Sequence, residues 1–253
     1  MRAAILGAGV GQRLQQPELP PKVMLSFGGE TLLARHVSTL RHYGISQIDL
    51  VVGYRAERVE QEIASIGAED FVQTIYNPEY ERGSIVSFWS LRDSLASGEP
   101  ILFMDGDVLY DHRMIRQLLN SPHENCFLMD RTTEEGEDPV KLCMTDEGLV
   151  DFHKRPQLAF DWWGEWIGFA RFSPAVASEI FEVCGRIIDG GERDEMYETA
   201  VREVLLKRPS GTFDVEDVTG LPWVEIDFPE DLRRAREEIF PSLAALPAPV
   251  SAD

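Results

Sequence analysis

One stretch decides the fold: Ala4-Ile5-Leu6-Gly7-Ala8-Gly9-Val10-Gly11-Gln12-Arg13-Leu14, which runs from an apolar segment into a glycine-rich loop and is soon followed by Pro20-Pro21-Lys22. Residues 3–6 predict a first strand. Glycines without a Cβ let backbone amides approach a polyphosphate, and we expect a helix N-terminus after the loop to add its positive dipole end. Arg13 and Lys22 add mobile positive charge. The combination predicts a nucleoside triphosphate site.

The spacing of this loop separates three kinds of nucleotide site. The dinucleotide fingerprint G-x-G-x-x-G needs glycine or alanine where the chain has Leu14, and a Walker A loop needs Gly-Lys-Ser/Thr at its end. The pattern that remains resembles the signature loop of nucleotidyltransferases that build activated sugars and alcohols, and it is matched by Leu6, Ala8, Gly9, Gly11, Arg13, Leu14, Pro21 and Lys22. The alternative is a tight strand-to-helix turn with an exposed arginine.

Length and charge restrict the class of protein. We expect the 253 residues to form a single domain over residues 1–240, with residues 241–253, rich in Ala and Pro, as a disordered tail. The net charge of -20 argues against nucleic acid or an anionic membrane as partner, because both need clustered cations. Three scattered cysteines fit buried thiols in a reducing compartment. No signal peptide or long apolar run is seen, so we expect a cytoplasmic protein.

Helix and strand patterns alternate along the chain, which predicts an α/β fold: a three-layer, Rossmann-like arrangement with a mixed, mainly parallel sheet. Strands are expected at residues 3–6, 48–54, 72–76, 101–104, 126–129, 140–144, 149–152 and 224–227. Helices are expected at residues 31–43, 58–66, 84–95, 197–206 and 229–239, and from Ser173-Pro174 onward. The short strands beyond residue 124 suit a partly antiparallel extension of the same sheet.

Two groups of carboxylates lie at predicted strand ends. Asp105-Gly106-Asp107 follows the apolar run 101–104, at the edge where open α/β sheets bind ligands, and Asp227 ends another predicted strand. Hard oxygen ligands of this kind suit Mg²⁺, which keeps its other positions for water and phosphates. The alternative for Asp105-Gly106-Asp107 is an ordinary acidic turn, and the alternative for Asp227 is a helix N-cap before Pro229.

Over nearly the whole chain these motifs resemble pyrophosphorylase-type nucleotidyltransferases, most of all the small cytidylyltransferases that act on phosphocholine, inositol phosphate or aminoalkylphosphonates. The resemblance implies Mg²⁺-dependent transfer from CTP: a phosphate or phosphonate oxygen attacks the α-phosphorus, and pyrophosphate leaves. It implies that Arg13 and Lys22 hold phosphates and that Asp107 and Asp227 bind the metal. The nucleotide would contact the remaining motif residues: Leu6, Ala8, Gly9, Gly11, Gly53, Tyr54, Asn77, Gly83, Ser84, Ser87 and, near the ribose, Asp105.

The acceptor site is predicted from charge and aromatic content. Lys141 is a candidate for the acceptor's phosphate, with a solvated surface lysine as the equal alternative, and Lys154-Arg155 is a weaker candidate. Residues 160–166 gather three of the five tryptophans between acidic residues, as in sites for ammonium groups. A phosphocholine-like head group would fit against Trp162, Trp163, Glu165 and Trp166, with Glu198 as a further carboxylate. Core or dimer-contact tryptophans are the alternative.

Other functions stay open at this level. One is a sugar-1-phosphate nucleotidyltransferase that uses UTP or another NTP, and a second is a GT-A-type glycosyltransferase, whose D-x-D turn also binds a divalent ion. A third is a nucleotide-binding regulator without turnover. The sequence does not fix the acceptor, the choice between CTP and UTP, or whether the protein is a homodimer.

Overall fold

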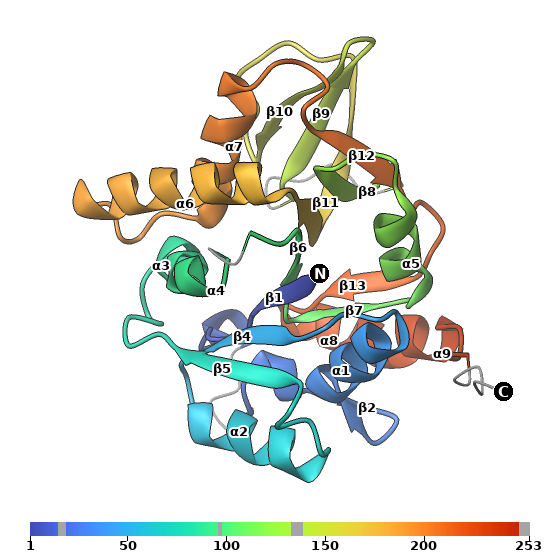
Figure 1. Ribbon diagram of the computed structural model, residues 1–253. Helices are drawn as coiled ribbons and strands as arrows, with labels where there is room; N and C mark the ends of the chain where they lie inside the picture. The colour runs from blue at the N-terminus through green and yellow to red at the C-terminus, as the bar shows by residue number, and fades with distance from the viewer. Residues whose placement is uncertain (15–18, 96–97, 133–138, 248–253) are drawn as a thin grey trace, which may run out of the picture.

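The computed structural model describes residues 1–14, 19–95, 98–132 and 139–247. Its centre is a nine-stranded sheet with helices on both faces (Figure 1). Four neighbouring strands run parallel in the order β6-β1-β4-β5: β6 (Ile101–Asp105), β1 (Arg2–Leu6), β4 (Ile48–Val52) and β5 (Val72–Tyr76). The predicted α/β class with a mixed, mainly parallel sheet is confirmed.

The second half of the sheet is mostly antiparallel and is organised by β11 (Trp162–Phe172). This strand pairs with β6, with β8 (Cys126–Asp130) and with β9 (Lys141–Thr145). Beyond β9 lies β10 (Gly148–His153), and β12 (Asp214–Asp217) pairs with β8 in parallel. Strand β11 therefore joins the parallel half to the extension that the sequence predicted.

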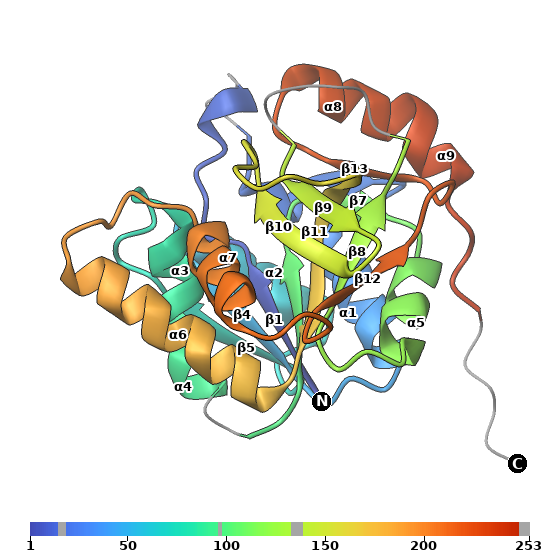
Figure 2. The same cartoon turned by 90° about the horizontal axis from the view of Figure 1, so that it is seen from above.

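Successive side chains of the central strands point to opposite faces of the sheet, and each face packs into its own hydrophobic core. In β1, Ala3 and Ile5 face one core and Ala4 faces the other, and all three side chains are fully buried. The first core is covered by α1 (Leu32–His42), α2 (Ala56–Ser65) and α5 (Arg113–Asn120), and the second by α3 (Ser84–Ser90), α6 (Pro174–Asp189) and α7 (Tyr197–Lys207). Figure 2 shows α3, α6 and α7 on one side of the sheet and α1 and α5 on the other.

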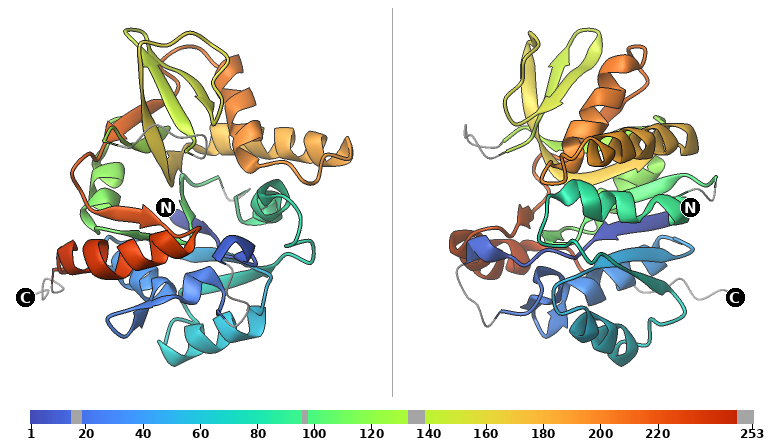
Figure 3. Two further views of the ribbon diagram at one scale, coloured as in Figure 1. Left: turned by 180° about the vertical axis from the view of Figure 1, so that it is seen from behind. Right: turned by 90° about the vertical axis from the view of Figure 1, so that its left-hand side faces the viewer.

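A smaller unit packs beside the first core. Strands β7 (Val108–Tyr110) and β13 (Trp223–Glu225) pair antiparallel, and the ribbon of β2 (Ser26–Phe27) and β3 (Glu30–Thr31) lies near them. The closing helical segment runs through α8 (Pro229–Arg234), η3 (Ala235–Ile239) and α9 (Phe240–Ser242), which Figure 3 shows as one continuous rod. A third cluster of apolar side chains, including Leu14, Val224 and Ile226, fills the space between these parts.

Part of the segment that the sequence assigns to a tail is held in place. Pro241 and Ser242 belong to α9, and the backbone N–H of Ala244 donates to Asp111 Oδ2 at 2.8 Å. Residues 248–253 lie outside the described residues. In the part of the chain that the structure covers, no helix has both the length and the apolarity needed to cross a bilayer.

Several elements differ from the sequence prediction. Strand β11 and helix α5 were not predicted, and the helix expected at residues 84–95 breaks at Leu91 into α3 and α4 (Arg92–Leu95). Both faces of β11 are largely buried, so it carries no polar alternation that would mark a strand. Its Gly168, with φ of +86°, interrupts the pattern further.

A buried ion pair anchors α7 to the sheet extension. Asp151 on β10 is fully buried and accepts hydrogen bonds from Arg202 Nε at 2.6 Å and from the backbone N–H of Gln157 at 3.0 Å. Burial alone would raise the pKa of Asp151, but Arg202 and these amides hold the pKa below its ordinary value. A carboxylate with a lowered pKa stabilises the fold above its ordinary pKa and loses that contribution as the pH falls through the folded-state value.

We expect Asp151→Asn to lower the free energy of unfolding by about 3 kcal/mol, because it leaves the Arg202 charge without its partner. The loss should shrink as the pH falls below the ordinary range of aspartate, where the parent protein also loses the charge. Urea denaturation at several pH values measures both effects. Glu203→Gln, which breaks surface pairs on the same helix, should cost no more than about 1 kcal/mol; equal losses for the two variants would contradict the assignment.

Candidate functional site

The glycine loop after β1 leaves its backbone open to a ligand. The carbonyl of Ala8 accepts from the N–H of Tyr54 at 3.0 Å, which ties the loop to the segment after β4. A Cβ at Gly9 would meet no atom within 4 Å, and Gly11 has a φ of +68° that favours glycine. The loop thus leaves its backbone at Gly9 free of contacts from other side chains.

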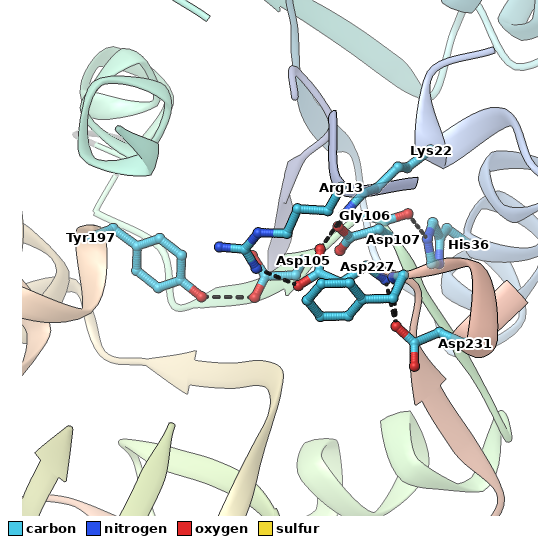
Figure 4. A network of polar contacts seen from close by, with 10 residues as sticks. Arg13, Lys22, His36, Asp105, Gly106, Asp107, Tyr197, Asp227 and Asp231 are labelled. Carbon is cyan, nitrogen blue, oxygen red and sulfur yellow. Dashed lines mark hydrogen bonds and ion pairs between the residues drawn. The ribbon is translucent and has the colours of Figure 1, made fainter. Parts of the chain in front are cut away.

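The described residues that follow the loop do not form the predicted helix. Residues Gln12–Leu14 form a single 3₁₀ turn, η1, which is too short to carry a useful dipole. Leu14 is buried in the third apolar cluster, and this anchors the turn so that Arg13 points toward the carboxylates (Figure 4). Positive charge near the loop therefore comes from side chains.

The turn Asp105-Gly106-Asp107 is held from three sides. The N–H of Gly106 donates to the carbonyl of Leu6 at 2.9 Å, and a Cβ at Gly106 would lie 2.6 Å from that oxygen, so only glycine fits. The fully buried His36 makes a 3.1 Å hydrogen bond from Nε2 to the carbonyl of Gly106. On the third side, Tyr197 donates to Asp105 Oδ2 at 2.7 Å.

The protonation of His36 follows from its surroundings. Burial lowers the pKa of His36 to about 4, so the ring is neutral near pH 7. A carbonyl oxygen only accepts, so the proton of the neutral ring is on Nε2, where it donates to Gly106. The ring also stacks on Tyr110, with centroids 5.6 Å apart.

An ion cluster joins the loop region to the acidic turn (Figure 4). Lys22 Nζ lies 2.9 Å from Asp107 Oδ2 and 2.5 Å from Asp227 Oδ1, while an Arg13 Nη atom lies 3.1 Å from Asp227 Oδ2. Burial alone would lower the pKa of Lys22, but the two carboxylates raise it above its ordinary value. Burial likewise opposes ionisation of Asp227, yet Lys22 and Arg13 lower its pKa. Lys22 and Asp227 are thus both charged near pH 7.

A third carboxylate completes a candidate metal site. Ligand atoms of Asp107, Glu225 and Asp227 lie within 4.8 Å of one another. Burial and the charges of Asp107 and Asp227 raise the pKa of Glu225, which indicates a surplus of negative charge. Three hard oxygen donors fit a Mg²⁺ ion, which leaves positions for water and substrate phosphates. The sequence analysis missed Glu225, although it stands two residues before Asp227 and so on the same side of an extended chain.

These groups open onto one cavity of about 870 Å³, a volume within the usual range for small-molecule sites. Many of the residues that the sequence singled out line it: Leu6, Ala8, Gly9, Arg13, Ser84, Ser87, Asp105, Asp107, Glu165, Trp166, Glu198 and Asp227. The structure therefore brings residues from both ends of the chain and from α3, β11 and α7 to one place.

Other residues that the sequence assigned to the nucleotide do not line the cavity themselves but pack behind the residues that do. Asn77 is buried and donates to Ser87 Oγ at 2.9 Å. Gly53 leaves room for Tyr80, which lines the cavity, and Gly83 lies against the backbone of residues 194–195. Glycine at these two positions permits close approaches that a Cβ would block.

The tryptophan segment does not form the aromatic cage that the sequence suggested. Trp162 stacks with the guanidinium of Arg131, at 4.2 Å from the ring centroid, and Trp163 lies 5.0 Å from Lys141 Nζ. These three predicted acceptor residues, Trp162, Trp163 and Lys141, are not among the cavity-lining residues in the described part of the chain. Trp166 does line the cavity, but it is only 5% exposed.

Several lining residues were missed by sequence reasoning or ranked low. Arg82, Arg234, Tyr80 and Tyr197 had no distinctive spacing, because they come from loops and helices that only the tertiary fold brings together. Lys154, the weaker of the two lysine candidates, lines the cavity. The site combines cations at the loop side with carboxylates on β6, β13 and α7.

Comparison with known proteins decides the family. A model of the MobA-like NTP transferase domain matches residues 3–154, which include the glycine loop and the acidic turn. The chain belongs to this family.

Relatives of this MobA-like NTP transferase chain cover most of its length. It is 25% identical to CTP:phosphoglutamine cytidylyltransferase of Campylobacter jejuni over 92% of this chain and 98% of the relative. It is 26% identical to CMP-5'-(3-aminopropyl)phosphonate synthase of Streptomyces rubellomurinus over 93% of this chain and 38% of the relative. The structure of CTP:phosphocholine cytidylyltransferase from Streptococcus pneumoniae superimposes with a TM-score of 0.74 at 21% identity, covering 93% and 97% of the two chains.

Removal of the hydrogen bond from His36 should lower the stability of this MobA-like chain. His36→Phe keeps the stacking on Tyr110 but leaves the Gly106 carbonyl without its donor, so we expect the free energy of unfolding to fall by about 2 kcal/mol. Denaturant unfolding measures the change. His42→Phe, at the end of the same helix, is the matched control and should change it by less than about 0.5 kcal/mol. An unchanged midpoint for His36→Phe would show that this hydrogen bond adds nothing.

Proposed function

We propose that this protein is a cytidylyltransferase that couples CMP from CTP to a small phosphorylated or phosphonate acceptor and releases pyrophosphate. One observation carries the proposal: beside an open glycine loop, Lys22 bridges Asp107 and Asp227, two carboxylates that line a cavity of about 870 Å³. The names of the two relatives support CTP as the donor and a phosphorylated or phosphonate compound as the acceptor.

The proposed reaction needs no nucleophilic side chain. A phosphate or phosphonate oxygen of the acceptor forms a bond to the α-phosphorus of CTP, the bond from that phosphorus to the bridging oxygen breaks, and its electron pair leaves with pyrophosphate. Catalysis then consists of positioning and charge stabilisation. Arg13 and Lys22 would stabilise the negative charge on the transferring group, and the amides around Gly9 would contact the triphosphate.

The carboxylates give this chemistry its metal ligands. Nucleotidyltransferases of this kind generally use a divalent metal. Asp107, Glu225 and Asp227 would hold Mg²⁺, which would draw charge from the phosphates when bound. Lys22 now balances these carboxylates, and its flexible stem lets the ammonium move to a phosphate when another cation takes its place.

The remaining lining residues divide between the two substrates. Ser84 and Ser87 on α3 would face the base, with Asn77 and Gly83 holding that wall, and Asp105 would lie near the ribose. We assign the acceptor's phosphate to Lys154, because it lines the cavity while Lys141 packs against Trp163.

A matrix of four nucleoside triphosphates against small phosphate acceptors tests the proposed function. We expect pyrophosphate release with CTP and a phosphorylated alcohol or phosphonate, and its loss when EDTA removes the metal. Preference for UTP with a sugar 1-phosphate would move the protein to sugar activation. Consumption of a nucleotide sugar would favour a glycosyltransferase, and CTP binding without any turnover would favour a regulator.

The metal assignment predicts the effect of one substitution. We expect Asp107→Asn to lower kcat at least about a hundredfold, because it removes a charge that both Lys22 and the metal need, while circular dichroism shows an intact fold. The matched control is Asp70→Asn, at an exposed side chain that pairs with Arg41 of α1 and does not line the cavity, and it should keep kcat within about twofold. Near-parent turnover by Asp107→Asn would remove this residue from the mechanism.

A further inference from the structure

We infer that the acceptor carries an ammonium group with N–H donors, and that Glu198 binds it. The inference rests on the proposed function and narrows its acceptor to two kinds of compound. These are phosphate esters of amino alcohols or amino acids, and phosphonates that carry an amino group.

Glu198 is held firmly in the wall of the cavity. It follows Tyr197 at the start of α7, and the backbone N–H of Tyr197 donates to Ser84 Oγ at 3.1 Å. The ring of Tyr197 packs between Phe88 and Phe103, at 5.3 and 5.0 Å between centroids. These contacts of Tyr197 hold the backbone at the start of α7, and with it the backbone of Glu198, in the cavity wall.

One oxygen of the Glu198 carboxylate lacks a donor. Its Oε2 is buried and has no hydrogen-bond partner among the described residues. An uncompensated buried carboxylate is costly, and burial raises the pKa of Glu198 to about 7. Asp105 and Glu225 add negative charge nearby, and Lys154 supplies positive charge. Oε2 of Glu198 still lacks a hydrogen-bond donor, and a positively charged donor would satisfy it.

The metal and the nucleotide do not supply that charge. The metal-binding group consists of Asp107, Glu225 and Asp227, and Glu198 is not part of it. CTP brings an anionic triphosphate and an uncharged base. The second substrate is the remaining source of a cation.

The surroundings of Glu198 favour N–H donors over a trimethylammonium group. A quaternary ammonium is usually held by open aromatic faces. Trp166 and Tyr197, which line the cavity together with Glu198, are only 5% and 3% exposed, and Trp162 and Trp163 pack against Arg131 and Lys141. An ammonium with N–H groups instead satisfies a carboxylate by charge-assisted hydrogen bonds.

A series of N-methylated acceptors tests this inference without changing the protein. Phosphoethanolamine, its N-methyl and N,N-dimethyl derivatives and phosphocholine lose one donor at each step, and ethyl phosphate lacks the nitrogen. With CTP, we expect kcat/KM from pyrophosphate release to fall along the series. Phosphocholine and ethyl phosphate should lie at least about tenfold below phosphoethanolamine.

Glu198→Gln tests the residue itself. We expect an increase of about tenfold or more in the KM for phosphoethanolamine, a change of less than about twofold in the KM for CTP, and loss of the preference over ethyl phosphate. Glu203→Gln, the same substitution on α7 away from the cavity, should behave like the parent protein.

The outcomes separate the two proposals. Equal use of phosphocholine or ethyl phosphate overturns the ammonium inference and leaves the cytidylyltransferase function standing. A rise in the KM for CTP alone in Glu198→Gln overturns it too, because the carboxylate would then bind the nucleotide. Absence of pyrophosphate with every triphosphate and acceptor rejects the proposed function, and the inference with it.

Discussion

The site depends on one ammonium group placed between two carboxylates. Lys22 lies 85 residues from Asp107 and 205 residues from Asp227 along the chain, yet one nitrogen contacts both. Two carboxylates this close repel each other unless a cation lies between them. The bridge therefore fixes three distant segments around one cavity. The apolar cluster that includes Leu14, Val224 and Ile226 packs these segments together. Any ligand that brings its own cation competes with Lys22 for the same oxygens.

The sequence predicted what local spacing determines. The glycine loop and Asp105-Gly106-Asp107 are short, contiguous motifs at strand ends, and the parallel strand order brings them together. Glu225, His36 and Tyr197 were not predicted as site residues, because their importance comes from partners elsewhere in the chain. His36, for example, reads as one more member of an amphipathic helix until its contact with Gly106 is seen.

The aromatic segment shows why composition alone misplaces a site. Trp162, Trp163 and Trp166 are close in sequence, but they belong to β11, whose successive side chains point to opposite faces of the sheet. Two of them cover Arg131 and Lys141, and the third packs against Phe127 and Phe152 in the core. The three tryptophans thus lie on a long strand inside the sheet, and two of them do not line the cavity.

The pair between Asp151 and Arg202 has a consequence for how the protein can diverge. It fastens α7, and with it Tyr197 and Glu198, to β10 rather than to the glycine loop. The family model ends at residue 154, ahead of this helix. The part of the wall formed by α7 can thus vary without a change in the glycine loop, while Asp227, which also follows residue 154, stays tied to the loop side through Lys22.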